Sequence, residues 1–252
     1  MTREASKTPL YAWPARARRG RSVPKATFYR HANVNSRLRQ QFVDQVERIT
    51  WAFGLAEGTV GLRGTAAVPE IQVFVVAAKA DDVADTVLAA MDRSVMTPVV
   101  FEVQRVAGNV RETRMTAAVK TLRGAAAPSL TAYFSTVWHR VASDDGAAPL
   151  GVGVAADAGT AAREERGFDA GRAGGAKRVP LPAAVNLEGL YAALLRPLLP
   201  LTPRTGEGPA ETAARAAEVR RLERQLAGLR RKIRSEPQLN RQLELRRELR
   251  PL

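Results

Sequence analysis

Two carboxylates and one lysine in the first half of the chain are the residues whose types could support catalysis. Glu70 begins one apolar strand-like run, Glu102 lies inside a second, and Lys120 lies at the end of a third. If a sheet gathers them, the carboxylates would hold Mg²⁺ and the ammonium group would orient or deprotonate the attacking water of a metal-dependent nuclease. The spacing departs from the usual restriction-nuclease pattern, because Gln104 stands where that pattern has its lysine. The alternative is that Glu102 is a solvent-facing strand residue between apolar neighbours.

Other catalytic centres are excluded by composition. The 252 residues contain no cysteine, so a disulfide scaffold, a thiolate zinc site and a cysteine nucleophile are ruled out. His31 and His139, the two histidines, are more than a hundred positions apart and lack carboxylates at a useful spacing. We therefore expect no metal site, no cofactor and a non-catalytic role.

Positive charge is concentrated at the two ends of the chain. The sequence has 39 Lys plus Arg against 25 Asp plus Glu, a formal net charge of +14. Residues 1–40 contribute 10 basic and 1 acidic residue (+9), residues 41–209 contribute 17 and 18 (−1), and residues 210–252 contribute 12 and 6 (+6). A near-neutral body with two basic ends attracts polyanions, so nucleic acid is the expected partner. The alternative is a composition set by a GC-rich genome.

The first basic end, residues 1–34, is predicted to be an extended arm because Pro9, Pro14 and Pro24 oppose a continuous helix. Its cations are candidate phosphate contacts: Arg16, Arg18, Arg19, Arg21 and Lys25. Three aromatic residues alternate with them: Trp13, Phe28 and Tyr29. Those rings would either stack on unpaired bases or pack into the core, and the sequence favours neither.

Residues 35–140 are predicted to form an α+β core with a mixed β-sheet covered by helices. A 3,4-spaced apolar pattern predicts a helix from Asn35 or Ser36 to Gly54, and two aspartates open a second helix, residues 81–93. Strands are predicted at residues 59–62, 71–78, 98–104, 114–121 and 130–138. Gly108 and Asn109 indicate a hairpin turn.

The remaining part of the body consists of a segment poor in bulky side chains followed by an apolar segment. Residues 141–178 hold eight glycines and little bulk, so they are predicted to be a flexible Gly/Ala-rich insertion. Residues 179–205 are predicted to close the core with a short helix that ends at prolines. No apolar run is long enough to cross a membrane and no export signal is evident, so we expect a cytoplasmic protein with no membrane partner.

The second basic end, residues 210–252, is predicted to be an α-helical hairpin, a short coiled coil formed on itself or on a partner helix. Its apolar residues step by 3, 4, 3 and 4 and form what we call the C-terminal stripe: Val219, Leu222, Leu226, Leu229 and Ile233. Its arginines lie off this stripe and are further candidate phosphate contacts: Arg220, Arg221, Arg224, Arg231 and Arg234. A second apolar set follows Pro237: Leu239, Leu243, Leu245 and Leu249.

Seven short blocks, spread in order over nearly the whole chain, carry a family resemblance: residues 11–14, 23–25, 46–51, 69–74, 186–191, 195–201 and 238–241. They resemble the bacterial family known as domain of unknown function 4391. Residues 141–178 look like an insertion relative to that family. The resemblance implies no established reaction. It implies a gene setting beside helicases and site-specific DNA methyltransferases, as in restriction-modification and phage-defence clusters.

Three hypotheses follow from these observations. The first is a non-catalytic accessory subunit that binds nucleic-acid backbone through the basic ends and docks on a helicase or methyltransferase. The second is a divergent Mg²⁺ nuclease that uses Glu70, Glu102 and Lys120. The third is a purely structural coiled-coil adaptor, in which the C-terminal stripe pairs with a partner helix and the arginines keep the complex in solution.

Overall fold

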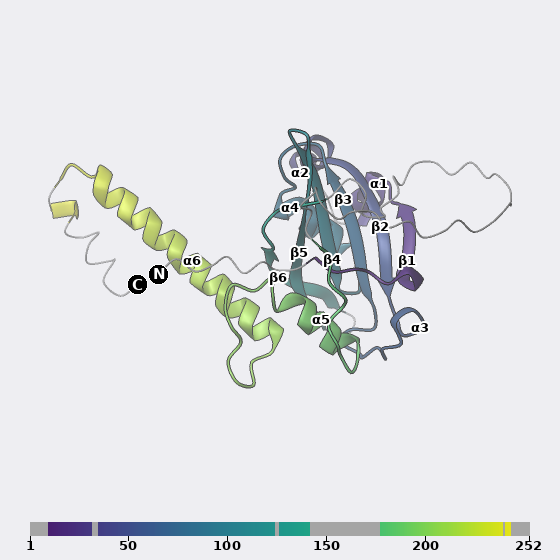
Figure 1. The fold of residues 1–252 in the computed structure, drawn as a ribbon. Coiled ribbons are helices and arrows are strands. Elements are labelled where there is room, and N and C mark those ends of the chain that lie inside the picture. The colour runs from purple at the N-terminus through teal and green to yellow at the C-terminus, as the bar shows by residue number, and fades with distance from the viewer. Residues whose placement is uncertain (1–9, 32–34, 124–125, 142–176, 239, 243–252) are drawn as a thin grey trace, which may run out of the picture.

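The computed structural model describes residues 10–31, 35–123, 126–141, 177–238 and 240–242. Its centre is a seven-stranded mixed sheet in the order β1-β2-β3-β4-β5-β6, with β7 paired to β5 (Figure 1). The strands are β1 (Arg18–Ser22), β2 (Val46–Leu55), β3 (Ile71–Ala78), β4 (Val99–Ala107), β5 (Val110–Arg123), β6 (Ala126–Ser135) and β7 (His139–Arg140). The helices are η1 (Ala15–Ala17, 3₁₀), α1 (Lys25–His31), α2 (Ser36–Gln45), α3 (Glu57–Val60), α4 (Asp85–Arg93), α5 (Leu187–Leu195) and α6 (Pro209–Ser235). The predicted α+β class with a mixed sheet and covering helices is confirmed.

The sheet is mixed because one connection crosses over. β3 and β4 run parallel and are joined through α4, whereas every other described strand pair is antiparallel. A parallel pair needs such a crossover, since its second strand must start again from the same end of the sheet. The predicted hairpin turn is confirmed, because Ala107 pairs with Val110 and Gly108 has a φ of 61°.

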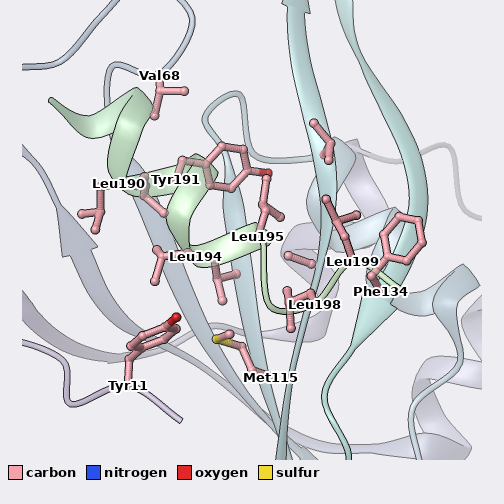
Figure 2. Packing of buried hydrophobic residues seen from close by; sticks show 14 of the residues in the cluster. Tyr11, Val68, Met115, Phe134, Leu190, Tyr191, Leu194, Leu195, Leu198 and Leu199 are labelled. Atoms are coloured by element: carbon pink, nitrogen blue, oxygen red, sulfur yellow. The ribbon is translucent and has the colours of Figure 1, made fainter. Parts of the chain in front are cut away.

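Both faces of the sheet are covered, so β3 and β4 are apolar along most of their length. On one face, α5 packs its leucines against the sheet together with Tyr11, Met115 and Phe134 (Figure 2). We call this cluster the α5 core. On the other face, α1, α2 and α4 pack around Phe42, Leu88 and further apolar residues. We call this second cluster the α4 core.

The helix predicted from Asn35 or Ser36 to Gly54 is only half correct. It starts as expected, because Asn35 Oδ1 accepts a hydrogen bond from the Leu38 backbone N–H at 2.8 Å, but α2 ends at Gln45. Residues 46–55 form β2 instead, paired with both β1 and β3. The apolar residues of this segment are mostly β-branched or aromatic, and burial between two strands outweighs their helical spacing.

Two further predicted elements differ from the structure. The strand predicted at residues 59–62 is replaced by the helical turn α3, which closes on Gly61 at a φ of 70°. The helix predicted from residue 81 begins at Asp85, since Asp82 Oδ1 accepts from the Val83 backbone N–H and from the Arg114 guanidinium. The strand predicted at residues 71–78 is confirmed and coincides with β3.

The N-terminal segment is not an extended arm in the part described. Residues 10–31 form η1, the edge strand β1 and the helix α1, which starts directly after Pro24. Ala12 and Val179 are joined by a backbone hydrogen bond of 2.7 Å, so the segment is also tied to the chain that follows the Gly/Ala-rich stretch. Pro24 therefore immediately precedes a helix instead of preventing one, and its carbonyl oxygen accepts a hydrogen bond from the Thr27 backbone N–H at 3.0 Å.

The predicted insertion falls largely outside the described residues, which resume at residue 177. In the C-terminal region, α6 is one helix of 27 residues, preceded by Gly208 as N-cap. Residues 240–242 are helical, and the Gln242 backbone N–H donates to the Gln238 carbonyl oxygen at 3.0 Å, but the hairpin stays a prediction, because residues 239 and 243–252 are outside the described part. In the described ranges, no helix has the length and apolar character needed to cross a membrane.

Candidate nucleic-acid interface

Four arginines surround the open edge of the sheet and form the first cationic surface. Arg16 lies in η1, and Arg18, Arg19 and Arg21 lie on β1, where all four are exposed. We call them the β1 arginine group. The strand is bulged between Arg18 and Arg21, and Gly20 at a φ of 64° lies within the bulge. A bulge adds one residue to the edge strand and increases its twist, which spreads the side chains outward.

The charge of this group is not neutralised by any carboxylate of the described residues. Within the described residues, none of the four arginines forms an ion pair with a carboxylate. Arg19 lies over the ring of Trp51 at 5.7 Å, and Trp51 is held in place by donating from Nε1 to Gln72 Oε1 at 2.8 Å. A cation over an aromatic face keeps its charge and its outward N–H groups. In the part of the chain that the structure describes, this edge therefore presents guanidinium groups without a carboxylate partner.

Gly54 contributes to this surface in a way that the sequence did not indicate. It does not end a helix but lies on β2, beside Arg19. A Cβ atom at Gly54 would be 3.1 Å from Arg19 Nε and 3.2 Å from Gln72 Oε1, which is tighter than ordinary contact. The glycine thus leaves the space that the Arg19 side chain occupies.

Lys25 and the three aromatic residues face the body rather than solvent. Lys25 Nζ donates to the Val46 carbonyl oxygen, and partial burial lowers the pKa of this lysine. Phe28 is 3% exposed in the α4 core, Tyr29 packs beside it, and Trp13 packs against the α5 core. Core packing, one of the two alternatives for these rings, is what the structure shows, so they do not form an exposed platform for bases.

The second cationic surface is the half of α6 that is remote from the sheet, residues 224–235, which we call the outer half. Among the predicted contacts, Arg224, Arg231 and Arg234 are exposed and form no ion pair with described residues. Residues 224–235 include five basic side chains and no acidic one. Two arginines nearer the body have other contacts. Arg220 lies 4.4 Å from the Phe134 ring and donates to the Tyr133 carbonyl oxygen, and Arg221 pairs with a glutamate one turn earlier.

The two cationic surfaces lie at opposite edges of the sheet. β1 is the first strand in the sheet order, whereas α6 leaves the body beside β5 and β6 at the other edge (Figure 1). A single short duplex lying flat on one face would not cover both. Each surface is therefore a separate candidate for binding.

The structure does not bring together the three residues of the nuclease hypothesis. Glu102 lies on the α5-core face of β4, between neighbours that point to the other face. Lys120 lies on the α4-core face of β5, where its side chain reaches α4. Glu70 is exposed before β3 and accepts a hydrogen bond from Gln72. Among the described residues, no group of three metal-binding side chains occurs, and Glu70, Glu102 and Lys120 lie in three separate sets of contacts instead of one catalytic group.

Glu102 is held in a structural ion pair and is 2% exposed, so the solvent-facing alternative is also wrong. Its Oε1 accepts from Trp13 Nε1 at 2.6 Å and from Arg178 Nη1 at 2.7 Å, and its Oε2 accepts from Arg178 Nη2 at 2.9 Å. Arg178 also donates to the Tyr11 carbonyl oxygen at 2.7 Å. A buried carboxylate with three charge-assisted or indole donors is stabilised in place rather than available to a metal.

The Lys120 ammonium group is likewise fully engaged in contacts within the protein. Its Nζ lies 2.5 Å from Asp92 Oδ1 and donates to the backbone carbonyl oxygens of Asp92, Val95 and Thr97 at 2.6 to 2.9 Å. Tyr133 donates from its hydroxyl to Asp92 Oδ2 at 2.7 Å. Burial raises the pKa of Asp92 and lowers the pKa of Lys120. The group fastens the C-terminal end of α4 to β5 and β6.

The fold and these side-chain contacts describe one class of protein. It is an α+β domain with two cationic surfaces, and its buried ion pairs are structural. A family model for "Domain of unknown function (DUF4391)" matches residues 12–252, and the chain belongs to that family. No curated protein and no solved structure matches the chain. The resemblance found in the seven sequence blocks is thus confirmed at the level of the family.

Proposed function

We propose that the chain is a non-catalytic accessory subunit of a DNA-acting system, of the restriction-modification or phage-defence type, and that it binds nucleic-acid backbone in the cytoplasm. The observation that supports this most directly is the β1 arginine group, because its four exposed guanidinium groups lack described ion-pair partners. Arginine forks match phosphate geometry and need no base contact. Binding of this kind is independent of sequence.

The outer half of α6 extends the proposal to a second region of backbone binding. Its basic residues project from a helix that leaves the body, so they can reach a strand that the β1 arginine group does not touch (Figure 1). Two separated binding regions on one molecule raise the overall affinity, because the second engages within an existing complex.

The protein partner belongs to the same proposal. We infer that a helicase or DNA methyltransferase subunit docks on the body, and this rests on the family resemblance rather than on a described surface. A short coiled coil through the C-terminal stripe is also part of the proposal. The structural adaptor is the second candidate function, and the observation that favours it is that none of the five stripe residues is buried by the described part of the chain.

The nucleic-acid proposal can be tested by charge removal at matched positions. One variant carries Arg→Gln at Arg16, Arg18, Arg19 and Arg21, and a second carries it at Arg224, Arg230, Arg231 and Arg234. The control carries the same change at four other exposed arginines without described ion pairs: Arg63, Arg93, Arg111 and Arg196. Binding to duplex and to single-stranded DNA is measured by fluorescence anisotropy at several salt concentrations.

The two site variants should bind more weakly than the control, and their log–log salt dependence should become shallower by roughly 0.9 for every duplex phosphate that the variant no longer neutralises. Equal weakening in all three variants would mean that total charge alone matters, and it would contradict the proposed surfaces. Co-expression with a helicase or methyltransferase, followed by purification with and without nuclease, separates the candidates. An adaptor retains its partner in both cases without binding DNA.

A further inference from the structure

The C-terminal stripe is not covered by the described part of the protein. Val219 is 37% exposed, and the other four residues of the stripe are only partly buried. The buried residues of α6 all belong to its first turns: Thr212, Ala213 and Ala216. Beyond Arg220, none of the described hydrogen bonds and ion pairs of α6 reaches another element. The described residues thus leave the continuous apolar stripe of the outer helix without a packing partner.

The body packs mainly against another side of the helix than the stripe. At about 100° per residue, the mean direction of Thr212, Ala213, Ala216 and Arg220 is turned from that of the stripe by about a third of a turn, and only Thr212, one heptad before Val219, lies in line with the stripe. The packing against the sheet therefore leaves the stripe from Val219 onward without a partner. Five apolar residues at strict 3,4 spacing are the pattern that pairs with another helix.

We propose that the occupant of this stripe is the α6 helix of a second copy of the chain, paired antiparallel. If Leu226 faces Leu229 of the second copy, Leu222 faces Ile233, and both contacts occur twice by symmetry. This register uses residues 219–236 of each helix. The overlap ends where α6 meets its own body, so the two bodies lie at opposite ends of the pair.

Charge complementarity selects the antiparallel direction. The residues beside the stripe include Glu223 and Arg230, both exposed and both without described ion pairs. In the antiparallel register, Glu223 of each copy faces Arg230 of the other. A parallel pair would instead place Glu223 opposite Glu218 of the other copy, which is repulsive.

The C-terminal part of the same chain fits the stripe less well. Its apolar residues step by 4, 2 and 4 along Leu239, Leu243, Leu245 and Leu249. A step of two places Leu243 and Leu245 on different sides of any helix, so this segment offers no unbroken matching stripe. A second α6 offers five residues at the required spacing. This inference does not rest on the proposed nucleic-acid binding.

The test uses the full chain, treated with nuclease and kept in high salt so that repulsion between the outward arginines is screened. Sedimentation equilibrium over a wide concentration range should show a species of twice the 27.3 kDa chain mass at the higher concentrations. Leu226→Lys should raise the dissociation constant at least about 100-fold, since each dimer then lacks two buried leucines. A monomer at all concentrations would overturn the proposal and leave the hairpin or another partner.

Charge changes, measured at lower salt so that the exposed ion pairs are not screened, test the direction of pairing. Glu223→Arg and Arg230→Glu should each weaken the dimer by about tenfold, and the double variant should restore it. Arg231→Glu makes the same change one residue away, on the outward side, and should not weaken it. Tighter association of Glu223→Arg would indicate a parallel pair and would overturn the antiparallel assignment.

A second measurement uses the absence of cysteine from the chain. Leu222→Cys and Ile233→Cys chains, mixed and oxidised, should form a disulfide-linked dimer, because the two positions face each other across the pair. Neither variant alone should do so. Cross-linking of Leu222→Cys with itself would contradict the proposed register.

Discussion

Glu102 and Arg178 form a bidentate ion pair, with Oε1–Nη1 and Oε2–Nη2 distances of 2.7 and 2.9 Å, although they are 76 positions apart. With Trp13 as third donor, this carboxylate joins three segments: the N-terminal segment, β4 and the segment around Arg178 that precedes α5. The pair therefore holds the cover of the α5 core on the sheet.

Arg178→Met should destabilise the protein by about 3 kcal/mol, because Glu102 is then a buried anion with one indole donor in place of a guanidinium. Urea unfolding measures this. Arg196→Met is the matched control, since Arg196 is exposed and forms no described ion pair, and it should change stability by less than about 0.5 kcal/mol. Equal unfolding midpoints for the two variants would contradict a structural role of the pair.

Lys120→Met should destabilise the protein by about 3 to 5 kcal/mol, because it leaves the buried Asp92 carboxylate without its cation. The double variant Lys120→Met with Asp92→Leu should recover part of this loss, since two apolar groups need no partner. A double-mutant cycle by chemical unfolding gives the coupling free energy. Additive effects would show that the two residues act independently.

The loss of stability caused by Lys120→Met should depend on pH, and it should be smaller in acid. Burial raises the pKa of Asp92, and loss of Lys120 removes the charge that opposes this rise. A carboxyl group whose folded pKa exceeds its unfolded value favours folding below the unfolded pKa and loses that contribution as the pH rises through the folded pKa. The stability difference between Lys120→Met and the original chain should thus shrink at acidic pH, as unfolding from about pH 3 to pH 8 can measure. A difference that is constant with pH would contradict this.

The folded conformation of the loop before α6 should become less stable in acid, because the Glu207 carboxylate that stabilises it becomes protonated. Hydrogen bonds from the Arg215 side chain and from the Arg204 backbone N–H hold the pKa of this carboxyl at about 2. A depressed pKa favours the folded state above the usual value of 4.5, and this contribution is lost as the pH falls from 4.5 to about 2. An NMR pH titration of the Glu207 side chain reports the pKa directly. Arg215→Gln should return it toward 4.5, and an unchanged pKa in that variant would contradict the assignment of cause.

Gly228 lies in the interior of the outer half of α6, and a Cβ atom there would meet no other group. Gly228→Ala should therefore stabilise the helix by about 1 kcal/mol, because alanine loses less backbone entropy on helix formation. Ala227→Gly, at the exposed neighbouring position, is the reverse control and should weaken it. Backbone amide exchange of residues 221–235 measures both, and equal protection in the two variants would contradict the prediction.

The sequence alone predicted those elements whose residue pattern is compatible with only one type of secondary structure. The apolar run of β3, the hairpin turn at Gly108 and the stripe of α6 are local features, and local spacing predicts them. Residues 46–55 show the limit. Their apolar spacing satisfied a helix, and only pairing with β1 and β3 made them a strand. The strand predicted at residues 59–62 was wrong for a different reason, since four residues are too few to show a periodic pattern.

The amino-acid sequence by itself determined where the charge lies along the chain and which segments must be buried, because charge and hydrophobicity belong to the residues. Tertiary structure decided which side chains meet. Glu102 and Lys120 looked like one catalytic group, but strand alternation and register place them on opposite faces of the sheet, each paired with a residue remote in sequence. The arginines of β1 stay without ion pairs in the described structure because they occupy the edge of the sheet, and edge position is set by the order of strands, which no local pattern encodes.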